Sequence, residues 1–397
     1  MSQNWDKFMQ KVKKARENLQ KVLETLNRIL IGYDTINKIL LTGIVAHENI
    51  LLIGPPGVGK TYLVSTLAKL INAKFYKYLL TKFTTDIEVF GMYNLKKLIE
   101  EYKVEREWGK IKDADIIFLD EVFKASSPIL NSLLSLLNER IIYDPYTGQE
   151  IPAKAISIIG ASNEVPYEDE LKAFYDRFPI RLFVDPIESD ELIRDALYSV
   201  WLSNHNLSPI ASIEDIKVLH QYAEVIIRSE IERIGKFIDV YHANVVPMIK
   251  TLKKEGLEVS PRTIIKKLPI YIASACALFG LNIDTISSYI IDIIPYLAKD
   301  KTESEQIRNK IFEQLGNIKE VYDYLMKARR ALIDKDFKKA YEYAKQVLNF
   351  DIEKLKHSIW CKKKIEEIIA QAKEIINFIE QTEKLAQSIV SQGLQFE

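Results

Sequence analysis

Short apolar runs alternate with helical patterns over the first half of the chain, up to about Asp185. Five of the runs predict β-strands, and several are continuously apolar, which is typical of strands covered on both faces. Segments with helical spacing separate them, so the pattern predicts an α/β fold in which helices cover each side of a parallel five-stranded sheet. The expected strands are 50–54, 74–80, 115–120, 155–162 and 181–185.

The rest of the chain predicts helices. Residues 186–300 combine acidic helix starts with apolar side chains at helical spacing, and residues 301–397 are rich in Lys, Glu, Gln and aliphatic side chains. With an N-terminal helix over 1–30, a core over 31–185 and an all-α region over 186–300, the chain is expected to end in a helical bundle or hairpin over 301–397. The apolar seam of that last region has a 3-4 spacing, broken at Thr382, and consists of Ile365, Ile368, Ala372, Ile375, Ile379, Ala386 and Ile389.

The composition excludes several classes of protein. Of 397 residues, 47% are hydrophobic and only 14 are Gly and 13 Pro, which excludes a largely disordered chain and favours long helices. The 55 basic and 55 acidic side chains cancel, so no global basic field draws the protein to nucleic acid or to a membrane. No membrane span is expected, because the longest uncharged stretch, 268–283, is too short to cross a bilayer.

The two cysteines, Cys276 and Cys361, predict no special chemistry. They form no CxxC pair and have no histidine at ligand spacing, so neither a disulfide framework nor a zinc site is expected. Idle or buried thiols suit a reducing compartment, and the N-terminus lacks the apolar stretch of a signal peptide. A cytoplasmic location is therefore expected.

One motif carries most of the chemistry. The segment GPPGVGKT directly follows an apolar strand and precedes a helical pattern, which is the context that a G-x-x-x-x-G-K-[ST] phosphate loop requires. Backbone N–H groups of such a loop point at phosphate oxygens, and the helix N-terminus adds partial positive charge. We expect Lys60 to pair with the β- and γ-phosphates and Thr61 to place its hydroxyl on Mg²⁺. The binding set is Gly54, Pro55, Pro56, Gly57, Val58, Gly59, Lys60 and Thr61.

Two further strands end in polar residues. The run IIFLDE predicts that Asp120 holds the Mg²⁺ shell and that Glu121 polarises an attacking water, although a solvated strand end gives the same pattern. Asn163 closes the run AISIIGAS and is expected to orient water beside the γ-phosphate, or else to be an ordinary turn residue.

Three arginines are candidates for transition-state stabilisation. Arg177, with Arg181 as the second choice, follows a short helical pattern and is placed to reach the nucleotide of a neighbouring subunit, or to form a surface salt bridge. Arg262 stands where a helix is expected to begin, so it either senses the γ-phosphate or is a simple first-turn arginine.

These five elements, in this order, resemble the AAA+ ATPases, and more closely the MoxR branch and its RavA-type members. The closer likeness rests on LTKFTTDIEVFG, FLDEVFKASSPILNSLLSLLNER, ASNEVP followed by AFYDRFPIRL, and VSPRTIIKKLPIYIASACALFG. It covers about residues 30–300. The RavA-type C-terminal module includes a β-barrel part, for which 301–397 has no strand pattern.

The resemblance implies a role for each candidate residue. Lys60 and Thr61 match the Walker A positions, Asp120 and Glu121 the Walker B pair, and the other three match sensor 1 (Asn163), the arginine finger (Arg177) and sensor 2 (Arg262). It implies ATP and Mg²⁺ as ligands, an all-α lid over 186–300, and a homo-oligomeric, hexameric ring in which Arg177 acts in trans. An insertion is expected at 91–110 and a hairpin at 141–152.

The leading hypothesis is an ATP hydrolase that remodels or matures protein complexes in a chaperone-like way, with a protein client and a partner carrying a von Willebrand A domain. One alternative is a AAA+ motor on nucleic acid, which neutral charge and the mixed Lys and Glu residues of 96–112 disfavour. The other is an ATP-gated assembly scaffold with little turnover. Glu121 disfavours that alternative, because binding alone needs no water-polarising carboxylate.

Overall fold

The computed structural model describes residues 2–144, 146–166, 169–202, 207–228, 237–254, 256, 259–280, 292–314, 318–333, 336–349, 368–382 and 384. The chain divides into two compact units, Met1–Ser304 and Glu305–Glu397.

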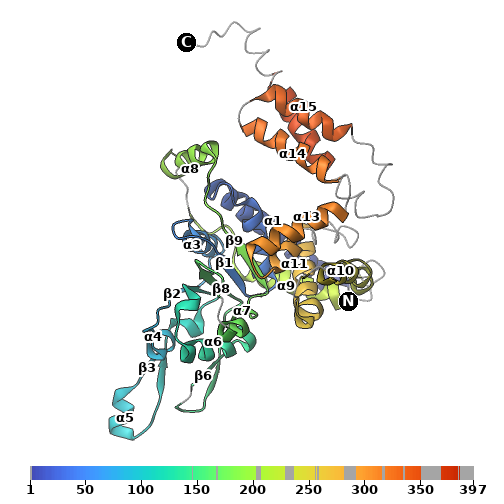
Figure 1. Cartoon of the computed structure of the whole chain (residues 1–397). Helices are drawn as coiled ribbons and strands as arrows, with labels where there is room; N and C mark the ends of the chain where they lie inside the picture. The colour runs from blue at the N-terminus through green and yellow to red at the C-terminus, as the bar shows by residue number, and fades with distance from the viewer. Residues whose placement is uncertain are drawn as a thin grey trace. The chain divides into compact units, whose positions relative to one another are not determined.

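A five-stranded sheet forms the centre of the first unit (Figure 1). Its strand order is β2-β5-β8-β1-β9, and every neighbouring pair is parallel. This confirms the predicted parallel sheet and places all the carboxyl ends of the strands at one edge. The strands are β1 (Ile50–Ile53), β2 (Phe75–Leu79), β5 (Ile116–Asp120), β8 (Ser157–Ser162) and β9 (Ile180–Phe183).

Helices cover both faces of the sheet. Strands β1 and β8 are buried along their whole length, and Phe118 of β5 is also fully buried, as expected of strands between two helical layers. These observations make the core the αβα arrangement of AAA+ proteins. The main helices of this part are α2 (Asp34–Val45), α3 (Lys60–Leu70), α6 (Ser127–Glu139) and α7 (Asp169–Tyr175).

Two excursions leave the core, at the segments expected to hold an insertion and a hairpin. The first contains α4 (Asp86–Phe90), β3 (Gly91–Tyr93), α5 (Leu95–Glu101) and β4 (Arg106–Trp108), and the second is the antiparallel pair β6 (Ile141–Tyr143) and β7 (Glu150–Pro152). The hydroxyl of Tyr93 donates to the carboxylate of Asp144 at 2.8 Å. Because Asp144 is fully buried, this hydrogen bond is an internal contact that joins the two excursions.

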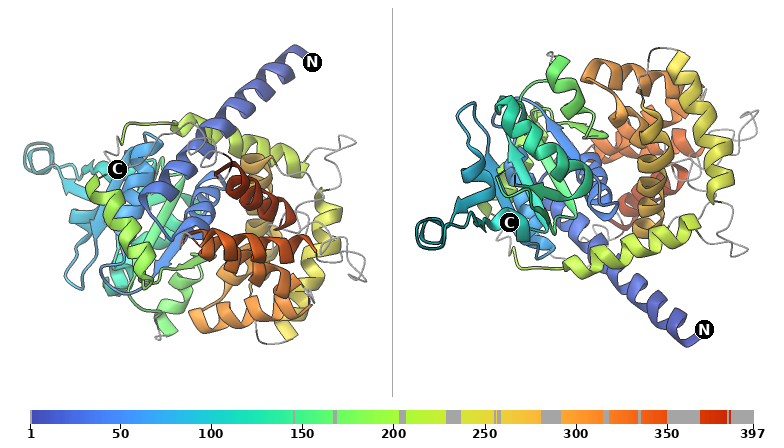
Figure 2. Two further views of the ribbon diagram at one scale, coloured as in Figure 1. Left: turned by 90° about the horizontal axis from the view of Figure 1, so that it is seen from above. Right: turned by 90° about the horizontal axis from the view of Figure 1, so that it is seen from below.

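Most of the remaining helices of the first unit gather to one side of the sheet, whereas the helix over 190–202 lies apart from them (Figures 1 and 2). Helix α1 packs against the lid through buried Val12, Leu19 and Leu26, and Arg16 donates to the carbonyl of Ala277 at 2.8 Å. These elements are α1 (Ser2–Ile29), α8 (Asp190–Leu202), α9 (Ile213–Arg228), α10 (Phe237–Lys254), a π-helical turn (Thr263–Lys267) and α11 (Leu268–Phe279).

The apolar stretch that begins at Leu268 is the buried helix α11, whose Cys276 is buried too, whereas Cys361 lies outside the described residues. Across the part of the chain that the structure describes, no helix is both long and apolar enough to cross a membrane.

The regular elements described in the second unit are all helical. Helix α13 (Lys301–Gln314) leads into it, α14 (Ile318–Ile333) packs against α15 (Phe337–Leu348), and a further helix covers 368–382. That last helix buries Ile368, Ala372, Ile375 and Ile379, which confirms this part of the predicted seam. Ile365, Ala386 and Ile389 lie outside the described residues.

Candidate functional site

The phosphate loop joins β1 to α3 at the carboxyl edge of the sheet. Gly57 and Gly59 have φ angles of 86° and 84°, in the left-handed region that favours glycine, and Gly59 caps α3. Gly54 is required for a different reason, because a Cβ there would lie 2.1 Å from the carbonyl oxygen of Val184. The motif thus folds into the tight loop that its glycines predict, running over the whole expected set from Gly54 to Thr61.

Lys60 is held at the start of α3 by three oxygen acceptors. Its ammonium lies 2.5 Å from the carbonyl of Gly54, 3.1 Å from that of Pro55 and 2.9 Å from the side-chain oxygen of Asn163. Burial lowers the pKa of Lys60, while the charges of Glu121 and Asp120 oppose the shift. A largely buried cation among neutral acceptors is a group that phosphate oxygens can recruit.

Thr61 and Asp120 form the candidate metal position. The hydroxyl of Thr61 donates to the carboxylate of Asp120 at 3.0 Å, so both oxygens meet beside the phosphate loop. Hard oxygen ligands of this kind suit Mg²⁺, which usually keeps waters and phosphate oxygens in the rest of its shell. The described residues contain no cluster of three or more His, Cys, Asp or Glu that could hold a metal ion.

Glu121 is held in a strained backbone conformation directly after β5. Its φ of 52° is unusual for a residue with a side chain, and such strain costs on the order of 1–3 kcal/mol. One carboxylate oxygen accepts from the amide of Asn163 at 2.6 Å, and the other lies 3.3 Å from the ammonium of Lys124. The structure therefore brings Glu121 and Asn163 together, because β5 and β8 are neighbours. Lys124 was not among the sequence candidates.

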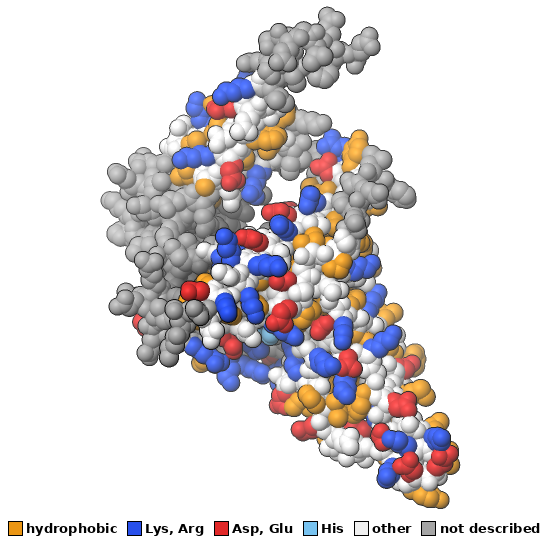
Figure 3. All heavy atoms as spheres, turned by 180° about the vertical axis from the view of Figure 1, so that it is seen from behind, with side chains coloured by type: hydrophobic (Ala, Val, Ile, Leu, Met, Phe, Trp, Pro, Cys, Tyr) orange, Lys and Arg blue, Asp and Glu red, His pale blue; other side chains and the backbone are white. Residues whose placement is uncertain are grey.

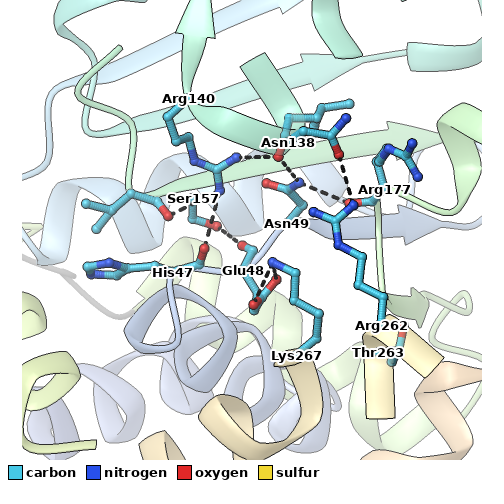
Figure 4. A network of polar contacts seen from close by, with 12 residues as sticks. His47, Glu48, Asn49, Asn138, Arg140, Ser157, Arg177, Arg262, Thr263 and Lys267 are labelled. Atoms are coloured by element: carbon cyan, nitrogen blue, oxygen red, sulfur yellow. Dashed lines mark hydrogen bonds and ion pairs between the residues drawn. The ribbon is translucent and has the colours of Figure 1, made fainter. Parts of the chain in front are cut away.

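The arginines Arg177 and Arg262 lie elsewhere, at the amino edge of the sheet where the strands begin (Figure 4). They line a cavity of about 210 Å³ together with Asn49, Asn138 and Lys267. Arg262 lies 3.5 Å from the side-chain oxygen of Asn138. Among the described residues, the guanidinium of Arg177 has no hydrogen-bond or ion-pair partner, and its Nε is buried.

Arg181, the second choice, is occupied inside its own subunit. It is 6% exposed, donates to the carbonyls of Leu297 and Ala298 at 3.1 and 3.2 Å, and lies over the ring of Tyr175 at 4.1 Å. Burial lowers its pKa, while Tyr175 and Asp176 oppose the shift. These contacts favour Arg177 over Arg181 as the arginine free to meet an external anion.

A cleft of about 1170 Å³ adjoins the phosphate loop. Gly54, Pro55 and Asn163 line one wall, and Lys253 and Ser260 of the lid line another. Its volume is ample for a nucleotide base and sugar.

Tyr33 is a further contact that the sequence did not reveal. Its hydroxyl lies 3.2 Å from the carbonyl of Val58 and 3.0 Å from that of Asp185, so it joins the phosphate loop to the segment after β9. Burial, and secondarily the charge of Asp185, raises the pKa of Tyr33 and keeps its hydroxyl a donor.

Comparison with known proteins gives one family match. Residues 17–221 match the family described as the MoxR domain in the MoxR-vWA-beta-propeller ternary systems. An uncharacterised protein of Methanocaldococcus jannaschii is 32% identical over 389 residues, or 91% of this chain and 97% of that protein. A second protein of that organism is 36% identical over 251 residues, and the chain spans only 64% of its length.

Two other similarities agree with this match. Chaperone MoxR1 of Mycobacterium tuberculosis is 25% identical over 209 residues, which cover 52% of this chain and 54% of that protein. The crystal structure of a proposed ATPase from Cytophaga hutchinsonii has a TM-score of 0.56 and 21% identity, and covers 74% of this chain and 90% of its own. At that identity the structural likeness supports the fold.

Proposed function

The chain belongs to the MoxR family of AAA+ ATPases, and from this premise we propose that it hydrolyses ATP between the subunits of a ring. The hydrolysis drives chaperone-like remodelling or maturation of protein complexes. One observation carries the proposal: the chain holds a phosphate cradle at the carboxyl edge of its sheet, and at the amino edge an arginine, Arg177, whose guanidinium has no partner among the described residues.

The separation of the two edges supports action in trans. Strand β1 has four residues, and at about 3.3 Å per residue it holds Asn49 and Gly54 roughly 16 Å apart. The backbone of Arg177 is tied to Asn49, so this arginine is remote from the Lys60 of its own subunit. A ring that places one subunit's amino edge on the next subunit's carboxyl edge completes both. Arg262 shares the cavity with Arg177, so we assign it to the same trans-acting group.

Within one subunit, the side chains divide the chemistry of phosphoryl transfer. Lys60 offsets charge on the β- and γ-phosphates, and Glu121 polarises the attacking water and receives its proton. Asn163 links them, since its side-chain oxygen accepts from Lys60 and its amide donates to Glu121. When phosphate oxygens take over Lys60, the side-chain oxygen of Asn163 is released and accepts a hydrogen bond from the attacking water, while the amide still donates to Glu121. Thr61 and Asp120 would hold Mg²⁺, which would supply further charge neutralisation at the phosphates.

The description of the matching family suggests a partner, and the protein client is part of the proposal. The matching family is described in systems with a von Willebrand A partner, so we propose such a partner here. The hexameric number, the RavA-type assignment and the cytoplasmic location stay predictions, as do the boundaries at residues 30, 185 and 300.

The charges of the first excursion count against a nucleic-acid motor. Lys97 lies 2.5 Å from Glu105, and Lys103 lies 3.3 Å from Glu101, so these ammonium groups are already paired. At the lower right of Figure 3, where this excursion projects, basic and acidic side chains intermingle. A phosphate track needs unpaired cations on one face.

The test is complementation between two inactive subunits, Glu121→Gln and Arg177→Ala. Alone, each lowers kcat about 100- to 1000-fold, because one lacks the water-polarising carboxylate and the other lacks the finger. When they are co-expressed, an intact Glu121 site next to an intact Arg177 forms at about one interface in four, so about a quarter of the wild-type rate returns.

Arg228→Ala is the matched control, since Arg228 is an exposed arginine of α9 paired with Glu224, and it keeps the wild-type rate. A co-expressed mixture that stays as inactive as its parents overturns hydrolysis between subunits. Full activity of Arg177→Ala alone overturns the finger assignment.

A further inference from the structure

Two consecutive residues just before β1 contact the segments that carry the arginines of the amino edge: Asn49 bonds the carbonyl of Arg177, and Glu48 pairs with Lys267, five residues after Arg262 (Figure 4). We propose that Glu48 and Asn49 are positioning residues that present Arg177 and Arg262 to the neighbouring nucleotide at a fixed spacing. Asn49 holds the turn that carries Arg177, and Glu48 holds the lid turn that carries Arg262. The inference rests on the proposed hydrolysis between subunits.

Asn49 clamps the Arg177 turn to the end of α6. It is 4% exposed, and its amide donates to the carbonyl of Leu137 at 2.9 Å and to that of Arg177 at 3.0 Å. Both donor hydrogens are therefore spent on backbone positions. The turn itself is closed by the bond from the Arg177 amide to the carbonyl of Phe174 at 3.1 Å. With its backbone fixed at both ends, Arg177 keeps only side-chain freedom.

Glu48 makes the matching contact to the lid. It is 4% exposed, and its carboxylate lies 2.8 Å from the ammonium of Lys267. Lys267 ends the π-helical turn that starts directly after Arg262. Residues five apart stack on one side of a π-helix, and such turns are frequent at functional sites. Holding Lys267 thus fixes the direction in which the turn presents Arg262.

The platform beneath these contacts is rigid and buried. Ser157 donates to the carbonyl of Glu48 at 2.6 Å, and Arg140 donates to the carbonyls of Leu137 and His47 at 2.9 and 3.3 Å. Burial lowers the pKa of Arg140 to about 10, while Glu48 opposes the shift. The ion pair of this platform is the one between Glu48 and Lys267, whose side chains are 5% and 31% exposed; such a pair adds little net stability but fixes a direction, which suits positioning.

The role is positioning, because neither side chain lies at the phosphate loop. Misplacing a catalytic group by about 1 Å costs up to about 100-fold in rate. We therefore expect Asn49→Ala to lower kcat about 10- to 100-fold and to leave the Kd for ATP within about twofold.

Complementation separates this role from mere structural damage. An Asn49→Ala subunit has an intact cradle and a misplaced finger, so co-expression with Glu121→Gln restores turnover, whereas co-expression with Arg177→Ala does not. The reverse pattern overturns the proposal, because it places the damage in the subunit's own cradle. Recovery with neither partner overturns it too, since that is the behaviour of a generally damaged subunit.

Two variants guard against a folding failure. Asn49→Leu fills the space without a donor and should give the same pattern. Lys267→Met, which removes the contact between Glu48 and the lid, should also regain turnover with Glu121→Gln and not with Arg177→Ala. Asn37→Ala is the matched control, since Asn37 is another fully buried asparagine, donates to Asn27 at 2.9 Å and has no tie to the arginines. It should retain normal kcat.

The reference mixture of Glu121→Gln with Arg177→Ala is run in parallel. If that mixture is inactive, the proposed function fails and this inference falls with it. If it is active and Asn49→Ala shows the wrong pattern, only the positioning role fails.

Discussion

At the carboxyl edge of the sheet, Lys60, Asp120, Glu121 and Asn163 all have partners inside the subunit, whereas at the amino edge the guanidinium of Arg177 has none among the described residues. In the first arrangement the polar side chains satisfy one another within the subunit. The second offers a buried nitrogen donor with nothing to satisfy it. Because leaving such a donor unpaired is costly, this edge is the one that awaits an external anion.

At the amino edge, hydrogen bonds fix the backbone around the unpaired guanidinium of Arg177. The side chains of Glu48, Asn49 and Arg140 bind backbone carbonyls and Lys267, so they hold the chain and do not occupy the guanidinium of Arg177. The carboxyl edge shows the opposite division. Its glycine-rich backbone can adopt more conformations, and its side chains bind one another. One edge therefore has a rigid frame around an unpaired group, and the other has a paired network on an adaptable loop.

The largest effect should come from removing one cation at each edge. Lys60→Met should weaken ATP binding about 100-fold or more, because the phosphates lose a desolvated ammonium. Arg177→Ala should leave binding within a few-fold and lower kcat about 1000-fold, as expected for a finger. Measuring the Kd with a fluorescent nucleotide and kcat by phosphate release separates the two.

Lys69→Met controls for the first change, because Lys69 is an exposed lysine of the same helix. If Arg177→Ala weakened binding as much as Lys60→Met, the two edges would serve one nucleotide in one subunit, and the comparison between them would fail.

The sequence predicted where the side chains of the carboxyl edge lie, because the segments that carry them are local; the roles of these side chains stay predictions. The phosphate loop is one contiguous segment, and Asp120 and Asn163 end apolar strands, so a parallel sheet brings them to the same edge. Glu121 was predicted on the same ground, although its left-handed backbone was not. Nothing in a strand pattern reports such strain.

The amino edge escaped prediction because its contacts are distant in sequence. Asn49 is separated by 88 residues from Leu137 and by 128 from Arg177, and Glu48 by 219 from Lys267. Glu48 and Asn49 precede a strand like any solvated pair, so no periodicity marks them as buried. Tyr93 and Asp144, which join the two excursions, were missed for the same reason.

Acid should lower the free energy of unfolding through His47, which lies next to Glu48 at the amino edge. His47 stacks on His220 of the lid at 3.6 Å, and burial, with His220 second, lowers the pKa of His47 to about 3. The unfolded chain, with a His47 pKa near 6.5, takes up the proton first, so stability falls as the pH drops from about 6.5 towards 3. At pH 5 the loss is about 2 kcal/mol relative to pH 7.5.

Urea unfolding at the two pH values measures this loss. His47→Asn keeps a residue that tolerates the φ of 57° and should remove most of the difference between pH 7.5 and 5. His242→Asn, at an exposed histidine of α10, should not. Equal pH dependence in all three proteins would assign the acid sensitivity to other groups.

The smallest effect is expected at Tyr33, on the carboxyl edge. Tyr33→Phe removes the hydroxyl that ties Val58 of the phosphate loop to the carbonyl of Asp185 and changes little else. One neutral hydrogen bond is worth about 1 kcal/mol, so the Kd for ATP should rise about fivefold, with kcat nearly unchanged. Tyr62→Phe, at a 47% exposed tyrosine of α3, is the matched control. A fall in kcat without a change in Kd would mean that the Tyr33 hydroxyl acts on the reacting groups and not on ATP binding. The phosphate loop would then not adapt independently of Glu121 and Asn163, which would contradict the contrast drawn between the two edges.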